Sequence, residues 1–259
     1  MATTRIYFNP YYILNKETYQ RHRDWLEGTP NSLANDRYIQ RTYLEIVDKD
    51  GPKKYKERLD LLDTDNSIHY LMTIHQSEIC RDAPSWNGME SDDARAILDD
   101  ITGSRKSAWG FAKDIAWQLL WGGFAAVETF APPKAGERLV DARQSGQRSY
   151  SRLYEPDDVV AWEFFDDDGP YRGQLRKVAL RNRVVRVERW ERGELTTQYH
   201  QTYKVYWLDN PGDRFKMQIF RSNKSVNEID DHHTEFVDIA PDPERGEEKT
   251  GDLDFIPVT

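Results

Sequence analysis

The sequence predicts an α+β protein in which a helical N-terminal half packs with a mainly antiparallel, β-rich C-terminal half. Before Gly123, apolar residues recur three and four positions apart, as on one face of a helix. After Gly123 the apolar period changes to two, in short segments that turn signals separate. We therefore expect residues 1–123 to form a helical region and residues 124–259 an antiparallel β-rich region, joined in one composite domain.

The composition is that of an ordered chain with large charged surfaces. Of the 259 residues, 38% are hydrophobic, 31% are charged and 12% are aromatic, and this aromatic fraction is too high for a disordered chain. The formal net charge of -9 repels nucleic acid. Contact with DNA would therefore need a local patch, or a ring that confines DNA without gripping it.

Cysteine usage and hydropathy exclude several classes of protein. Cys80 is the only cysteine, which rules out an intrachain disulfide framework and a Cys-based zinc site, and fits a reduced, intracellular protein. The first residues, "MATTRIYFNPYY", do not have the charged-then-apolar order of a signal peptide. No apolar run approaches the roughly 20 residues that span a bilayer, so we expect no membrane partner.

Cap residues place the helices of the first half. We expect a helix over 35–47, and another over 51–80 that is interrupted near "DTDNS", where Asp and Asn compete for backbone donors. Ser91 is the expected N-cap of a short helix that ends before Gly103. Ser107 is the expected cap of the next helix.

That next helix, "SAWGFAKDIAWQLLWGG", ends at Gly122 and Gly123. Its apolar residues lie nearly all round its axis, which is typical of a helix buried between neighbours. We therefore expect it to be the central helix of the N-terminal half.

The pattern of residues 124–259 predicts a series of strands. "FAAVETFAPP" predicts a short strand that the two prolines stop. The segments "VVAWEFF", "QLRKVALRNRVVRVERWE", "TTQYHQTYKVYWLD" and "RFKMQIFRSN" follow, separated by turn signals. They predict a meandering antiparallel sheet with one face packed and one solvated. The final "FIPVT" either adds to a sheet edge or belongs to a longer chain.

An acidic cluster in the middle of the chain is the first candidate for chemistry. Asp157 and Asp158 precede "VVAWEFF", so we expect them at a strand entrance with side chains on opposite sides, where they cannot share a metal ion. Asp166 to Asp168 precede Gly169 and Pro170, and this combination of residues predicts a turn. His232 and His233, in "DDHHTE", do not have the spacing of a zinc site. We predict no catalytic, cofactor-binding or metal-binding residues.

Seven basic residues stand out in "LRKVALRNRVVRVERWER", which begins at Leu175. A nucleic-acid stripe is one reading of this run. We favour an exposed sheet face that meets acidic loops of a neighbouring subunit, because acids elsewhere in the chain outnumber these bases. The candidate subunit-interface or DNA-proximal residues are Arg176, Lys177, Arg181, Arg183, Arg186 and Arg189.

Three segments follow one another in the second half of the chain: "RSYSRLYEPDDVVAWEFF", then "LRKVALRN", then the final "FIPVT". They resemble the "RPY...Y.PEDIINW" element and the strands that follow it in the N-terminal, wing-type region of tailed-bacteriophage portal proteins, and the resemblance extends from Tyr55 to the end. "SAWGFAKDIAWQLLWGGFAAVETFAPP" is similar to its helix, glycine and short strand, although "AVETFAPP" departs from the usual small apolar and Asp pattern. The signature positions are Tyr154, Pro156, Asp158, Trp162, Gly122 and Gly123.

The resemblance implies a virion structural protein without enzymatic activity. It implies a cyclic homo-oligomer, usually a dodecamer, at a capsid vertex, through which DNA passes without tight binding during packaging and ejection. The implied partners are further copies of the chain, capsid protein, a head–tail adaptor and terminase, with assembly in the host cytoplasm. The sequence ends before the stem and clip that portal proteins carry.

Two alternatives stay open from the residues alone. One is a metal-dependent hydrolase or nuclease that uses the cluster around Asp157 and Asp158. The other is a non-portal α+β module that mediates head–tail interactions.

Overall fold

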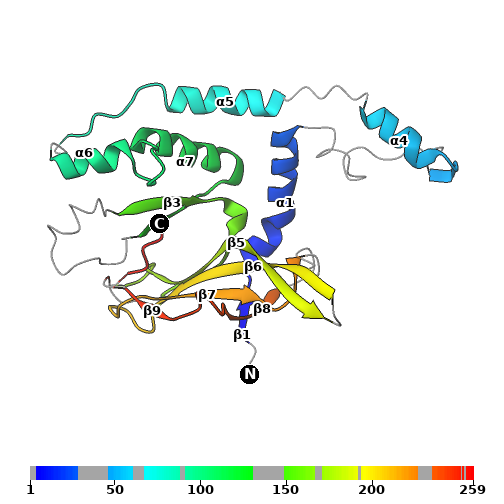
Figure 1. Ribbon diagram of the computed structural model, residues 1–259. Helices are drawn as coiled ribbons and strands as arrows, with labels where there is room; N and C mark the ends of the chain where they lie inside the picture. The colour runs from blue at the N-terminus through cyan, green and yellow to red at the C-terminus, as the bar shows by residue number, and fades with distance from the viewer. Residues whose placement is uncertain are drawn as a thin grey trace.

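The computed structural model describes residues 4–28, 46–60, 67–87, 91–130, 149–166, 171–191, 194–226, 235–251, 253 and 255–259. It confirms the predicted α+β class, with helices in the N-terminal half and a mostly antiparallel sheet in the C-terminal half. A layer of helices lies over a small two-stranded sheet, and a larger curled sheet lies beneath both (Figure 1).

The helices begin and end largely at the predicted caps. The Ser91 and Ser107 side chains accept hydrogen bonds from the backbone N–H groups of Ala94 and Gly110. Gly123 ends its helix in the left-handed conformation, with φ at 78°. The helices are α1 (Pro10–Glu27), α4 (Gly51–Asp60), α5 (Ser67–Ile79), α6 (Asp92–Asp99) and α7 (Ala108–Gly122), and a 3-10 turn, η1, spans Pro156–Asp158.

The larger sheet is antiparallel throughout, with the strand order β1-β8-β7-β6-β5-β4, and β9 pairs with β7. The small sheet pairs β2 with β3. The strands are β1 (Thr4–Tyr7), β2 (Ala126–Phe130), β3 (Tyr150–Tyr154), β4 (Val159–Phe164), β5 (Leu175–Glu191), β6 (Glu194–Trp207), β7 (Lys216–Ser222), β8 (Phe236–Pro241) and β9 (Lys249–Thr250).

Asn9 brings the two edges of the larger sheet together. Its backbone N–H donates to the Val160 carbonyl at 2.9 Å, and its side-chain amide donates to the Trp162 carbonyl at 3.0 Å. The Asn9 side chain also accepts from the Tyr11 N–H and so caps α1, with Pro10 at the first helical position. Asn9 therefore lies between β1 and α1, caps the helix, and joins the two edge strands so that the sheet is curled.

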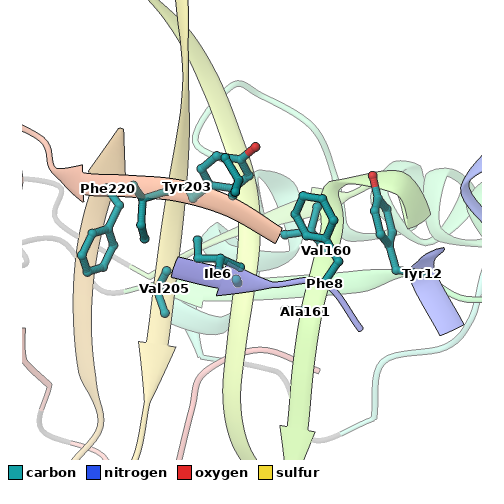
Figure 2. Packing of buried hydrophobic residues seen from close by; sticks show 11 residues of the cluster. Ile6, Phe8, Tyr12, Val160, Ala161, Tyr203, Val205 and Phe220 are labelled. Carbon is teal, nitrogen blue, oxygen red and sulfur yellow. The ribbon is translucent and has the colours of Figure 1, made fainter. Parts of the chain in front are cut away.

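Both faces of the curled sheet are buried, so the expected single packed face is wrong. The inner face holds a cluster that includes Ile6, Tyr203 and Phe220, with side chains from β1 and β8 meeting those of β4 to β7 (Figure 2). The outer face carries a second cluster, which includes Leu180 and Tyr206 and lies against the small sheet. Burial on both faces accounts for the consecutive buried residues Val159, Val160 and Ala161 of β4.

The C-terminal residues extend the small sheet. The Thr259 N–H donates to the Val127 carbonyl at 3.0 Å, and the Val127 N–H donates back to the Thr259 carbonyl at 2.8 Å. Glu128 and Val258 form an antiparallel bridge. The expectation that "FIPVT" adds to a sheet edge is therefore confirmed, and the edge is that of β2.

Two expectations for the helical half need correction. A strand, β1, lies at the start of the region predicted to be helical, and its partner β8 is more than 200 residues away in the sequence. The helix α7 is not buried all round, because Leu119 is 48% exposed and Leu120 is 37% exposed. The helix predicted over 35–47 lies outside the described residues except for its last two positions.

Candidate functional site at the junction of helices and sheets

The signature positions meet where α7 ends and η1 begins. Gly122, the last residue of α7, lies so close to Pro156 that a Cβ on Gly122 would stand 2.0 Å from the proline Cγ. The next residue, Gly123, takes the left-handed conformation and turns the chain towards β2. Two motifs that are more than 30 residues apart in the sequence thus form one tight contact.

Tyr154 anchors the same junction from the end of β3. Its ring is 1% exposed, and its hydroxyl donates to Glu128 Oε2 at 2.8 Å. Burial raises the pKa of Tyr154, and the neighbouring Glu128 carboxylate raises it further, so the hydroxyl stays a donor. The Tyr154 side chain therefore links β3 to β2 through this hydrogen bond.

Sequence reasoning missed Glu128, the most deeply buried ionisable side chain of the junction. It is fully buried on β2 and also receives hydrogen bonds from Lys204 and the Tyr206 hydroxyl, both on β6. Burial and the adjacent carboxylate raise the pKa of Tyr206 as well. The single acid in the apolar segment "FAAVETF" was the available signal. Its two partners on β6 hold the small sheet on the outer face of the larger one.

Trp162 links the junction to α1. Its ring centroid lies 6.1 Å from that of Tyr11 and 6.0 Å from that of Phe124, both in tilted or edge contacts. These rings line a largely apolar cavity of about 720 Å³, which the C-terminal residues Ile256 and Val258 also line. The signature tryptophan therefore packs against three separate parts of the chain.

The two central aspartates lie directly before β4, as predicted, but in a helical turn and not in an extended segment. Pro156 starts the 3-10 turn η1, and Asp157 and Asp158 are its next two residues. Arg23 of α1 pairs with Asp157 and with Glu155, at 2.6 Å in each case. The acids hold the helix α1 against the turn through an arginine.

The carboxyl group of Asp158 has a raised pKa. Burial raises the pKa of its carboxyl to about 6, and the charges of Asp157 and Glu155 raise it further. Arg181 of β5 and Arg23 of α1 oppose that rise. Ionised Asp158 is therefore disfavoured in the folded protein relative to the unfolded chain, where an Asp titrates near 3.9.

The pH dependence of stability gives a direct check on this cluster. Between pH about 4 and about 6 the folded protein holds a proton at Asp158 that the unfolded chain has lost, so rising pH lowers stability across this window. We expect Asp158→Asn to raise the free energy of unfolding by roughly 1–3 kcal/mol at pH 7 and by little at pH 4. Urea unfolding at both pH values measures this difference.

The exposed Asp166 offers a matched control, since Asp166→Asn removes the same charge without burial and should leave stability nearly unchanged. A lower stability of Asp158→Asn at pH 7 would show instead that the contact with Arg181 outweighs the desolvation of the carboxylate.

The structure separates the basic residues that the sequence grouped together. Lys177 lies on the inner side of the curled sheet near Glu163, and Arg181 donates to the Tyr12 hydroxyl at 3.0 Å. Arg176 lies over the Phe165 ring, with 5.8 Å between the guanidinium carbon and the centroid.

Further along β5, Arg183 is exposed and Arg186 pairs with Glu188 at 2.5 Å. Arg189 is placed by its backbone pairing with Thr196. Their role at an interface or near DNA stays a prediction.

The remaining candidates for chemistry are only partly described. His232 and His233 lie outside the described residues. Within the described ranges, no group of three or more His, Cys, Asp or Glu side chains is placed to hold a metal ion. Cys80 is buried at the end of α5.

The helix α5 exposes its apolar side chains. It contacts α7 through polar side chains. The His69 and Trp117 rings meet in a tilted arrangement with their centroids 5.1 Å apart, and Gln76 donates to the Lys113 carbonyl at 2.7 Å. None of its residues is buried. The large hydrophobic side chains that it exposes are Ile68, Tyr70, Leu71, Ile74 and Ile79, with exposed fractions from 40% to 66%. We call these five side chains the α5 apolar surface.

No protein-family model matches the chain, and no curated protein matches it. Among the helices that the structure describes, none is long and apolar enough to cross a membrane.

Proposed function

We propose that this chain is a structural subunit that assembles with copies of itself into a portal-type ring at a phage capsid vertex. The observation that carries the proposal is the α5 apolar surface. A surface helix normally turns its large apolar side chains to the core, whereas α5 leaves five of them exposed and contacts α7 through His69 and Gln76. Several exposed apolar side chains on one helix are typical of a contact with another molecule.

The helix α7 also exposes apolar side chains. Leu119 and Leu120 are exposed on the helix that packs against α5. Aliphatic and aromatic side chains such as Leu71 and Tyr70 are those that protein interfaces bury at their centres. A helical layer with exposed apolar side chains on its outer side is what a subunit of a larger assembly requires.

The junction described above supports the portal-type reading. The positions that resemble the portal element, Tyr154, Pro156 and Trp162, lie inside one packed joint between α7, η1 and β4. In a ring this joint would set the angle between the helical layer and the sheets. The function would be architectural, with terminase supplying the ATP chemistry, and capsid protein and the head–tail adaptor as further partners.

The net charge fits this role. A chain with a formal net charge of -9 repels the DNA backbone, so DNA could slide through a ring of such subunits without tight binding.

The mass of the purified protein in solution tests assembly. We expect mass photometry and light scattering to show a species many times heavier than the 30.5 kDa chain. Replacing Leu71 and Ile74 of the α5 apolar surface by Asp should raise the concentration needed for assembly by roughly tenfold or more, because buried apolar side chains dominate interface energies. Electron microscopy of the assembled species should show closed rings.

A matched control uses apolar side chains that are equally exposed elsewhere. Val226 and Leu253 are 38% and 41% exposed, away from α5, and their replacement by Asp should leave assembly unchanged. A stable monomer that binds a divalent metal ion would overturn the proposal in favour of the metal-dependent hydrolase.

A further inference from the structure

The two ends of the helical layer carry opposite charge. The α6 end, residues 91–100, has four Asp residues and one Arg, whereas α4 has four Lys or Arg residues, one Glu and one Asp. The figure places α6 at one end of the layer and α4 beyond α1 at the other (Figure 1). The charges therefore cannot meet within one copy of the chain.

The basic side of α4 faces outward. Tyr55 is buried, while Lys53, Lys54 and Lys56 are exposed around it. Lys54 pairs with Asp48, but the Lys53–Glu57 pair is long, at 3.9 Å, and both of its side chains are well exposed. This outward side is available to a second molecule.

Among the described residues, the helix α4 has few contacts with the other helices. It takes no part in the larger helix–helix contacts among the described residues, which join α5 with α7, α1 with α5, α1 with α7 and α6 with α7. A helix of 10 residues is marginal in water without packing. A contact with another copy would supply that packing.

Apolar side chains accompany the charges at both ends. Ile46 and Val47, directly before α4, are 67% and 58% exposed. At the other end, Ile79 closes α5, Trp86 lies in the segment that leads to α6, and Ile97 lies on α6 itself, and all three are exposed. Each end thus combines exposed apolar side chains with charged ones. Residues 46–60 hold five Lys or Arg and four Asp or Glu, with the three lysines of α4 exposed, and residues 91–100 hold four Asp and one Arg.

We propose that residues 46–60 of one copy dock on the α5–α6 end of the next copy, head to tail. The exposed lysines of α4 would face Asp92 and Asp99 of α6, and Ile46 and Val47 would cover Ile97. Charge complementarity fixes the register of such a contact, and the apolar side chains stabilise it. This inference deepens the proposed function and rests on it, since it assumes that copies assemble.

The position of α4 favours a head-to-tail contact over a two-fold one. It extends past the end of the helical layer along the length of the layer, and not over its outer face (Figure 1). The copy that α4 reaches therefore lies alongside. A contact between two different surfaces repeats from copy to copy and closes into a ring when the rotation allows it.

Charge reversal tests the contact. The triple variant Lys53→Glu, Lys54→Glu, Lys56→Glu should need at least roughly tenfold more protein to assemble, because like charges would then face each other. Asp92→Lys with Asp99→Lys should weaken assembly in the same way, and the chain that combines both sets should recover most of it. Raising the salt concentration should weaken assembly of the unaltered protein.

The matched control changes the net charge by the same amount as the triple lysine variant, at positions far from α4. Lys224, Arg245 and Lys249 are exposed and lie in and around β7 to β9. Replacing these three residues by Glu should leave assembly as in the unaltered chain. Circular dichroism on every variant checks that the fold is kept.

Cysteine cross-linking distinguishes head-to-tail contact from a two-fold dimer. In a Cys80→Ser chain, Lys56→Cys combined with Asp99→Cys should give, on mild oxidation, a ladder of covalent oligomers beyond the dimer. Each single variant should give no such ladder. A two-fold contact would stop at the dimer.

The outcomes separate the two proposals. If the chain assembles, but the charge reversals have no effect or the double-cysteine chain gives no product above the dimer, the docking of residues 46–60 is wrong and the ring proposal stands. If the unaltered chain is a monomer at all concentrations, both proposals are wrong.

Discussion

Replacing Glu128 by Ala should lower the free energy of unfolding by about 3–5 kcal/mol, because it removes the acceptor of a buried charge and two buried hydroxyls. Lys204, which is 17% exposed at its side chain, would lose its counter-charge, and Tyr154 and Tyr206 would lose the carboxylate to which they donate. The small sheet would then rest on the larger one through apolar contacts and the hydrogen bond from Arg152 to Asn182. Chemical denaturation followed by tryptophan fluorescence measures the loss.

The control for Glu128 is another glutamate of a strand. Glu163 is exposed on β4 and its carboxylate lies 4.0 Å from Lys177, so Glu163→Ala should change stability by less than about 1 kcal/mol. Glu128→Gln should fall between the two, since an amide oxygen still accepts hydrogen bonds but leaves Lys204 unpaired. An effect of Glu128→Ala no larger than that of Glu163→Ala would show that the carboxylate does not hold the sheets together.

Local signals predicted the helix boundaries well because caps act within one turn of the chain. Ser91, Ser107 and Gly123 cap their helices through hydrogen bonds to residues three or four positions away. The same holds for β2, whose strand-like residues stand between a glycine and two prolines. At these positions the cause was local and the sequence alone was sufficient.

Long-range contacts account for most of what the sequence did not show. The strand β1 forms by pairing with β8, and Asn9 joins it to β4, so no signal near residue 4 could reveal either partner. The second buried face of the curled sheet depends on the small sheet that covers it. The consecutive apolar residues of β4 were nevertheless a sign of burial on both sides.

The turn η1 shows a conflict between two local signals. Pro156 followed by two acids is typical of a helix start, because proline suits the first helical position and acids suit the first turn. The apolar residues that follow, beginning at Val159, are typical of a strand. The whole segment was assigned to the strand, and the turn that holds Asp157 and Asp158 was therefore not predicted.

The inverted helix α5 could not be recognised from its periodicity. An amphipathic pattern shows that two faces differ, but it does not show which face meets the core of the same chain. Here the polar face, with His69 and Gln76, meets α7. The orientation follows from contacts that only the structure shows, and it is the observation on which the proposed assembly depends.

Gly122→Ala should lower the free energy of unfolding by about 3 kcal/mol, although helix propensity alone predicts a gain of roughly 1 kcal/mol at a helical position. The added Cβ would stand 2.0 Å from Pro156 Cγ and 2.9 Å from its Cβ, so α7 or η1 must move. Pro156 is buried and belongs to the same turn as Asp157, whose pairing with Arg23 would also be disturbed. Thermal and urea unfolding give the sign and the size of the effect.

A double-mutant cycle shows whether the clash is the cause. Pro156→Ala removes the closest atom, so it should restore part of the stability that Gly122→Ala loses, with a coupling of about 1 kcal/mol or more. The neighbouring Gly123→Ala should lose roughly 1–2 kcal/mol through its φ of 78°, with no atom within 4 Å of the new Cβ, and Pro156→Ala should not rescue it. Rescue of both glycine variants, or of neither, would contradict the contact between Gly122 and Pro156. Rescue of Gly122→Ala alone would show that the end of α7 and the start of η1 are held at one fixed separation, which is what a joint between the helical layer and the sheets requires.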